Sequence, residues 1–130
     1  MTAEAMRAAM QRYIELVDAG DVDGILALYA DDARVEDPVG TPPLIGRTAI
    51  ERFYHKGLGR NKVHAHLTGP VRVAGNCAAM PFRIELEWDG QPCTIRVIDV
   101  MEFNEDGRFQ SMKAYWGGTI SSFAECLQGP

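Results

Sequence analysis

The sequence predicts an α+β domain in which N-terminal helices pack on one face of a curved antiparallel sheet. Apolar residues recur at steps of three and four up to about residue 58 and at steps of two from about residue 63. Turn signals separate the later segments, so these segments should form consecutive hairpins. Because neither an internal repeat nor a linker interrupts the chain, we expect a single domain over residues 1–130.

The first half of the chain carries three helical patterns. The apolar stripe of the first consists of Met6, Met10, Tyr13, Ile14 and Val17. This helix should end at Gly20, and a second helix should run from residue 21 to residue 30. A short extended segment, residues 33–37, precedes a loop rich in Pro and Gly over residues 39–46. The third helical pattern covers residues 47–58.

The second half predicts extended segments separated by tight turns. These segments cover residues 63–67, 80–88, 94–103 and 108–116. Asp89–Gly90 and Asn104–Gly107 are the turn signals between the last three segments. We assign no role to the tail after about residue 117.

Composition excludes several classes of function. The net charge of −5 and the pI near 5.1, without a basic stripe, argue against nucleic acid or an anionic membrane as a partner. Cys77, Cys93 and Cys126 lack the paired spacing of a disulfide framework or a zinc site. The N-terminal segment is interrupted by charges, and no apolar run reaches the length of a membrane span. We therefore expect a cytoplasmic protein.

The sequence also shows no motif for a metal or cofactor site. His64 and His66 alternate on one strand face, but no Cys, Asp or Glu pair stands at ligand spacing. We therefore expect a solvated face rather than a metal site. Because no His or Lys cluster adjoins the cysteines, nothing would activate a thiolate. The expected protein uses neither a metal nor a cofactor.

One carboxylate breaks the strand pattern. Asp99 has the same parity as Ile95, Val97, Met101 and Phe103, so it should point to the apolar face. A buried, unpaired carboxylate becomes neutral, and a neutral carboxylic acid can donate a hydrogen bond. The alternative is an aspartate at the sheet edge that reaches solvent or an arginine. Since the opposite face also carries apolar residues, the pattern leaves both open.

Asp37 and three tyrosines are the other candidates. Asp37 precedes Pro38, which holds it extended where a strand enters a loop; the alternative is a solvated turn residue. Tyr13 lies in the first apolar stripe, where it is either a core tyrosine or part of a hydroxyl network with Tyr29 and Tyr54. A base at the mouth of an apolar cleft containing neutral donors suits proton removal beside a carbonyl.

Four segments carry a family resemblance: R-Y-I-E-L-V-D-A-G-D, Y-A-D-D-A-R-V-E-D-P-V-G-T-P-P, G-P-V-R-V-A-G-N-C-A-A-M-P-F-R, and V-I-D-V-M-E-F followed by A-Y-W. In combination, from about Met10 to Trp116, they resemble the bacterial Δ5-3-ketosteroid isomerases. The resemblance implies the cone-shaped fold also seen in nuclear transport factor, scytalone dehydratase and polyketide cyclases. The sequence departs from these relatives at G-R-N-K, residues 59–62, which could alter access to the cleft.

The resemblance also implies roles for the candidate residues. Asp37 would be the general base, and Tyr13 with a protonated Asp99 would form the oxyanion hole around a steroid ketone. Tyr29 and Tyr54 would support Tyr13 through hydrogen bonds.

A cleft for a flat hydrocarbon ligand needs an apolar lining with few polar contacts. The expected substrate-binding residues, by spacing and resemblance, are Phe82, Met80, Ile84, Met112 and Trp116. Leu86 and Trp88 share the strand face of Phe82, and we expect them in the core or in a dimer contact.

The resemblance thus implies a steroid Delta-isomerase that converts 3-oxo-Δ5-steroids to 3-oxo-Δ4-steroids through a dienolate, without a cofactor, as a homodimer. The alternatives are a carrier of hydrophobic ligands, a protein-binding module, and a polyketide cyclase or dehydratase with an Asp–His pair. Fold alone does not separate these classes. The joint presence of Tyr13, Asp37 and Asp99 favours the isomerase.

Overall fold

The computed structural model describes residues 1–59, 62–88 and 90–117, with Trp88 described by its backbone alone. The described helices are α1 (Ala3–Ala19), α2 (Val22–Leu28) and α3 (Arg47–Gly59). The described strands are β1 (Tyr29–Glu36), β2 (Leu44–Ile45), β3 (His64–Leu67), β4 (Arg72–Ala74), β5 (Cys77–Trp88), β6 (Gln91–Phe103) and β7 (Phe109–Tyr115). The C-terminal tail and half of the 59–62 loop lie outside the described residues.

The helix boundaries follow from local capping. The side chain of Thr2 accepts a hydrogen bond from the backbone N–H of Ala5 at 3.0 Å, which opens α1. Gly20, with a φ of 69°, closes α1 in the left-handed conformation. Asp21 caps α2 by accepting from the N–H of Gly24 at 2.9 Å. The end of α1 at Gly20 and the cap of α2 at Asp21 agree with the sequence pattern.

One helix boundary was predicted wrongly. The sequence pattern extends the second helix to residue 30, but α2 ends at Leu28 and β1 begins at Tyr29. Tyr29 pairs with Phe109 of β7, and both side chains are almost completely buried. Strand pairing and burial therefore override the helical preference of this segment.

The sheet has the strand order β2-β1-β7-β6-β5-β3, and β4 pairs with β5. The β5–β6 and β6–β7 pairs are antiparallel, as the turn signals predict, but β1 lies parallel to β7. The sheet is therefore mixed rather than wholly antiparallel. β2 and β4 were not predicted, because segments of two and three residues are too short to show an alternating pattern.

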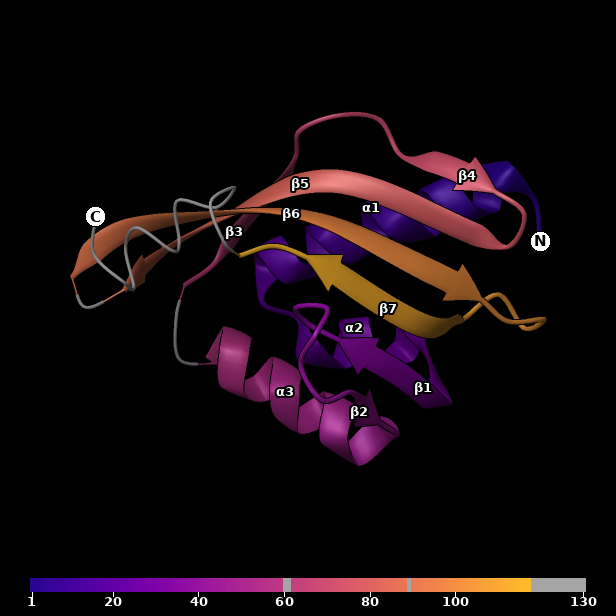
Figure 1. Cartoon of the computed structure of the whole chain (residues 1–130), viewed down its shortest axis with the longest axis horizontal. Helices are drawn as coiled ribbons and strands as arrows, with labels where there is room; N and C mark the ends of the chain where they lie inside the picture. The colour runs from indigo at the N-terminus through magenta and orange to yellow at the C-terminus, as the bar shows by residue number, and fades with distance from the viewer. Residues whose placement is uncertain (60–61, 89, 118–130) are drawn as a thin grey trace.

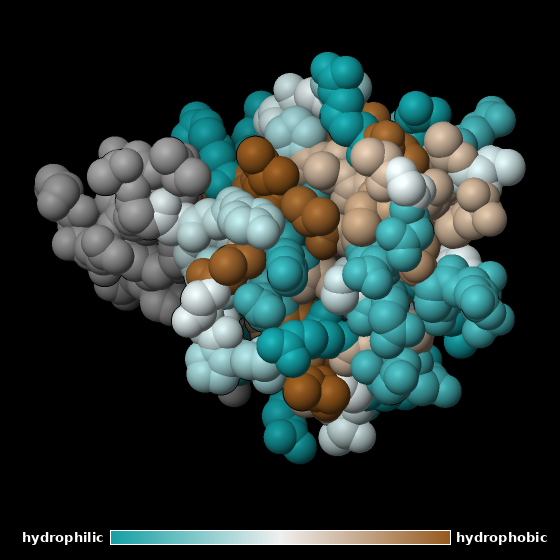
Figure 2. All heavy atoms as spheres, turned by 45° about the vertical axis from the view of Figure 1, so that its right-hand side comes forward, coloured by the Kyte–Doolittle hydropathy of each residue, from teal (hydrophilic) through white to brown (hydrophobic). Residues whose placement is uncertain are grey.

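Helices and sheet enclose the core between them. Figure 1 shows β5 and β6 as long neighbouring strands that curve over α1, with α3 beside β1 and β2. Asp18 at the end of α1 accepts from the backbone N–H of Ala65 at 3.1 Å, which ties this helix to β3. On the face shown in Figure 2, hydrophilic and hydrophobic side chains of the described residues are interspersed. None of the described helices is long and apolar enough to cross a membrane.

Candidate active site

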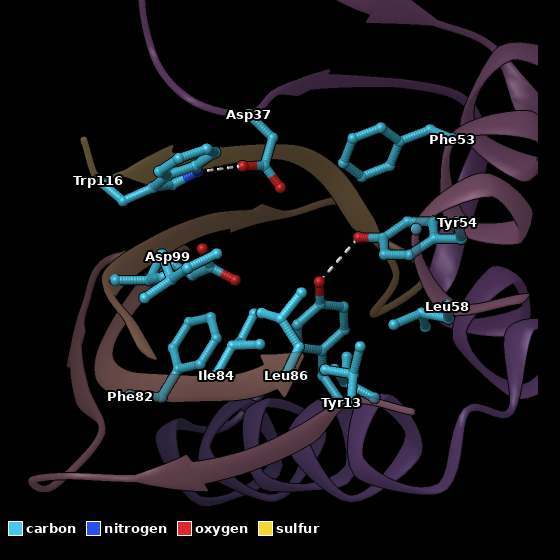
Figure 3. A pocket seen from close by; sticks show the side chains of 15 residues that line it. Tyr13, Asp37, Phe53, Tyr54, Leu58, Phe82, Ile84, Leu86, Asp99 and Trp116 are labelled. Atoms are coloured by element: carbon cyan, nitrogen blue, oxygen red, sulfur yellow. Dashed lines mark hydrogen bonds between the residues drawn. The ribbon is translucent and has the colours of Figure 1, made fainter. Parts of the chain in front are cut away.

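A cavity of about 240 Å³ opens between α1, α3 and the inner faces of β5 and β6. Its lining is aliphatic and aromatic except for a few polar side chains that gather at one end (Figure 3). These polar contributions come from Tyr13, Asp37, Tyr54, Asp99 and Trp116. A largely apolar cavity with a few converging polar groups is typical of a site for a small organic ligand.

The parallel pairing of β1 with β7 brings the two aspartates to one place. Glu36 pairs with Lys113, so Asp37, the next residue, leaves the sheet at the level of Ala114. Ala114 in turn pairs with Asp99 on β6. The backbones of Asp37 and Asp99 therefore lie on either side of β7, about 10 Å apart at the usual strand spacing. Residues that are 62 positions apart in the chain thus line one cavity.

Asp37 lies directly after β1, joined to Pro38 by a cis peptide bond. The indole N–H of Trp116 donates to its Oδ1 at 2.5 Å (Figure 3). Burial raises the pKa of Asp37 to about 6, and the hydrogen bond from Trp116 opposes part of that rise. The side chain is therefore a carboxylate at neutral pH with a strengthened affinity for a proton.

Asp99 is buried on the inner face of β6, with 1% of its surface exposed. Inner and outer positions alternate through the strand, and the neighbouring Ile98 is 49% exposed on the outer face. The alternative of a solvated aspartate at the sheet edge is therefore wrong. Neither carboxyl oxygen has a hydrogen-bond partner within the described part of the chain. Burial, followed by the negative charge of Asp37, raises the pKa of Asp99 well above its usual range, so the group is neutral.

The three tyrosines form one chain of hydrogen bonds. The hydroxyl of Tyr54 lies 2.8 Å from that of Tyr13 and 2.6 Å from that of Tyr29. Burial raises the pKa of all three hydroxyls well above 10, so they are neutral donors and acceptors. Tyr13 and Tyr54 reach the cavity, whereas Tyr29 lies behind them in the core.

The expected substrate wall is only partly at the cavity. Phe82, Ile84 and Trp116 line it, but Met80 and Met112 do not. Both methionines are fully buried, with 0% and 1% of their surfaces exposed, and they belong to the core. Met80 pairs with Asp99 and Met112 with Met101, so both stand at or beyond the polar end of the cavity. The expectation that they face a ligand is corrected accordingly.

Leu86, unlike the two methionines, lies closer to the cavity than expected. It was expected in the core or in a dimer contact, but it lines the cavity. The side chain of Trp88 lies outside the described residues.

Sequence reasoning missed several lining residues: Val17, Phe53, Leu58, Val63, Ile95 and Val97. Two signals could have found some of them. Val17 stands one helical turn after Tyr13, and Ile95 and Val97 share the strand parity of Asp99. Both signals identify the inner side of an element, but neither shows which half of that side is hollow.

Histidines lie away from the cavity. His55, His64 and His66 are exposed, and the described lining contains none of them. His64 Nδ1 lies 3.4 Å from Asp18. Within residues 1–59, 62–88 and 90–117, no three His, Cys, Asp or Glu side chains are grouped as metal ligands.

Comparisons with known proteins agree with this fold. Residues 10–112 match the SnoaL-like domain family. The steroid Delta-isomerase of Nocardioides simplex is 44% identical over 116 residues, which cover 89% of this chain and 92% of that enzyme. The chain belongs to the steroid Delta-isomerase family. Members of this family are enzymes of the isomerase class, with the α+β fold described above.

Two further proteins that are similar to this chain are named for a different chemistry, the opening of epoxides. The epoxide hydrolase LasB of Streptomyces lasalocidi is 34% identical over 129 residues, which cover 95% of this chain and 45% of that protein. The structure of SalBIII, described as an epoxide hydrolase/cyclase-like enzyme in pyran ring formation, matches with a TM-score of 0.82 at 24% identity. That match covers 89% of this chain and 93% of SalBIII, and it shows the shared fold.

The first prediction concerns the carboxyl of Asp37. In a titration followed by carbon NMR, this group should titrate with a pKa of about 6 in the unaltered protein. Trp116→Phe removes the donor that lowers this pKa, so the pKa of Asp37 should rise further. Titration at the usual aspartate value in both proteins would contradict the burial argument.

The second prediction concerns stability. Because the pKa of Asp99 is higher in the folded state than in the unfolded state, folding loses stability as the pH rises above about 4. Asp99→Asn and Asp99→Leu remove this loss, so their melting temperatures relative to the unaltered protein should improve from pH 4 to pH 8. Thermal unfolding at both pH values measures the difference. If the melting temperatures of the variants instead fell relative to that of the unaltered protein as the pH rises, Asp99 would be stabilised as a carboxylate.

Proposed function

We propose that the protein isomerises 3-oxo-Δ5-steroids to 3-oxo-Δ4-steroids by moving one proton within the substrate. The observation that carries this proposal is the neutral Asp99, which lines the same apolar cavity as the ionised Asp37 and whose two oxygens have no hydrogen-bond partner in the part of the chain that the structure describes. A buried polar group without a partner is costly unless a ligand completes its hydrogen bonds. The identity of 44% to a steroid Delta-isomerase supports the same substrate class.

Asp37 acts as the base in this scheme. Its carboxylate removes a proton from the carbon between the ketone and the double bond, and the electron pair moves onto the ketone oxygen as a dienolate. The protonated Asp37 then gives the same proton to the far carbon of the original double bond. The new double bond is conjugated with the ketone, and the enzyme returns to its starting state. A carboxylate with a pKa of about 6 suits both steps, because a base works best with a pKa near the working pH.

Asp99 and Tyr13 stabilise the dienolate oxygen. Both are neutral donors, so their hydrogen bonds strengthen as negative charge develops on that oxygen. When Tyr29 donates to Tyr54 and Tyr54 donates to Tyr13, the proton of Tyr13 is left for the ligand. Each hydrogen bond in such a chain polarises the next, which strengthens the donor at its end.

A second candidate reaction is the opening of an epoxide. The neutral carboxyl of Asp99 could protonate the epoxide oxygen while Asp37 takes a proton from the attacking water or hydroxyl. The relative LasB, named as an epoxide hydrolase, favours testing it. In each turnover Asp99 loses a proton and Asp37 gains one, and proton exchange with solvent then restores both groups; the isomerisation leaves the proton of Asp99 in place. The Asp–His pair of a dehydratase is disfavoured because the described lining contains no histidine.

The third prediction tests the proposed reaction. Purified protein mixed with 5-androstene-3,17-dione, without added cofactor, should produce the ultraviolet absorbance of a conjugated enone. Asp37→Asn should lower kcat by at least about 100-fold, because it removes the general base but keeps the size of the side chain. The kcat/KM of the unaltered enzyme should rise with pH as Asp37 ionises around pH 6.

The control measurements separate the alternatives. Steroid binding without any enone would support a carrier, and turnover of an epoxide alone would support the second candidate. Full activity of Asp37→Asn would refute the assignment of the base.

We also infer a homodimer that forms through the outer face of the sheet. Ile98 and Tyr115 pair across β6 and β7 on this face, with 49% and 42% of their surfaces exposed. Pro81 on β5 is the neighbour of Ile98 on its other side. An apolar pair in the middle of a sheet is suited to burial against a second copy.

The fourth prediction follows from this interface. Sedimentation should show a dimer for the unaltered protein, and Ile98→Glu should shift it to a monomer because burying an unpaired charge at the contact is costly. Ile45→Glu, at an exposed position on β2, should leave the dimer intact. A monomeric unaltered protein would refute the inferred interface.

A further inference from the structure

The cavity has a direction that three elements share. α1 contributes Tyr13 at the polar end and then Val17, one helical turn or about 6 Å further on. α3 contributes Tyr54 and then Leu58 at the same interval. Beyond the polar residues, every described lining side chain is a hydrocarbon.

The sheet gives the same direction. Along β5 the lining runs from Phe82 through Ile84 to Leu86, about 13 Å at the usual rise of a strand. In the register with β6, Phe82 is near the level of Asp99 and Leu86 is far from it. A ligand whose ketone lies at the polar end therefore extends its remaining rings toward Leu58 and Leu86.

Gly57 lies on the cavity side of this apolar end. Successive residues of an α-helix are about 100° apart, so position 57 falls between Phe53 and Tyr54 in direction, about 40° from the first and 60° from the second. Both of these side chains line the cavity, and so does Gly57. A side chain at position 57 would point into the cavity, and its Cβ would meet no atom within 4 Å.

The backbone does not require glycine at this position. Gly57 is helical and is not among the glycines with a positive φ. Any residue other than proline would favour the helix more than glycine does. The remaining reason for glycine at position 57 is the space that it leaves open in the cavity.

We propose that Gly57 determines substrate specificity: the space beside it admits the far rings of a tetracyclic ketone, and a large side chain there would exclude them. This inference rests on the proposed function, because it assumes that the ketone end of the substrate occupies the polar end of the cavity. A two-ring ketone with the same reacting atoms is shorter and keeps its far end away from position 57.

Two substrates and two variants test the inference. The substrates are 5-androstene-3,17-dione and a bicyclic octalone with the same ketone and β,γ double bond. Gly57→Phe should lower kcat/KM for the tetracyclic ketone, relative to that for the bicyclic ketone, by at least about 10-fold, as expected for a steric conflict in an apolar pocket. Gly59→Phe is the matched control, because Gly59 is also helical with open space around its Cβ but does not line the cavity.

The outcomes are distinguishable. The specificity role would be overturned if Gly57→Phe lowered kcat/KM equally for both ketones. It would also be overturned if Gly59→Phe changed the ratio of the two kcat/KM values as much as Gly57→Phe does. If the unaltered protein isomerises neither ketone, the proposed function fails, and equilibrium dialysis with the tetracyclic product then tests position 57 by binding alone. Gly57→Phe should weaken that binding by at least about 10-fold, and undiminished binding would refute the inference. Thermal unfolding confirms that each variant is folded.

Discussion

The parallel pairing of β1 with β7 is the constraint on which the rest of the site depends. In a wholly antiparallel sheet, the end of β1 would lie beside the start of β7, and Asp37 would be far from Trp116. The parallel pair instead brings the ends of both strands to one edge, where the indole of Trp116 holds the carboxylate of Asp37. The antiparallel pairing of β7 with β6 then sets Asp99 at the same level through Ala114. Strand topology thus supplies the two carboxyls of the polar end, and α1 and α3 add Tyr13 and Tyr54.

Burial acts differently on the two carboxyls because their surroundings differ. Asp37 keeps a donor and is only partly buried, so its pKa rises only moderately. Asp99 is fully buried and has no donor among the described residues, and the charge of Asp37 adds to the effect of burial, so it remains protonated. One aspartate is therefore a proton acceptor and the other a hydrogen-bond donor at the same pH. Keeping an unpartnered acid in the core lowers the stability of the empty protein, as is common where a site is organised for its ligand.

The fold class and the candidate site residues could be predicted from the sequence, whereas the shape of the cavity could not. The parity of Asp99 and the position of Asp37 before Pro38 are local properties, and the structure brings both residues to one cavity. The start of β1 at Tyr29 and its parallel partner depend on contacts between distant segments, which periodicity does not encode. Met80 and Leu86 show the same limit. Both have inward parity, but Met80 is fully buried in the core whereas Leu86 lines the cavity.

Ala114 of β7 lies between Asp37 and Asp99, so strand pairing sets the distance between the backbones of the two residues. Asp99 pairs with Ala114 across β6 and β7, and the backbone N–H of Val39, two residues after Asp37, donates to the carbonyl of Ala114 at 2.8 Å. Side chains on α1 and α3, by contrast, shape the apolar end of the cavity. Substitutions at Val17 or Leu58 can therefore change the outline of the cavity while Asp37 and Asp99 keep their places. The shape of the apolar end and the separation of the two carboxyls thus depend on different parts of the fold, helix side chains for the first and strand pairing for the second.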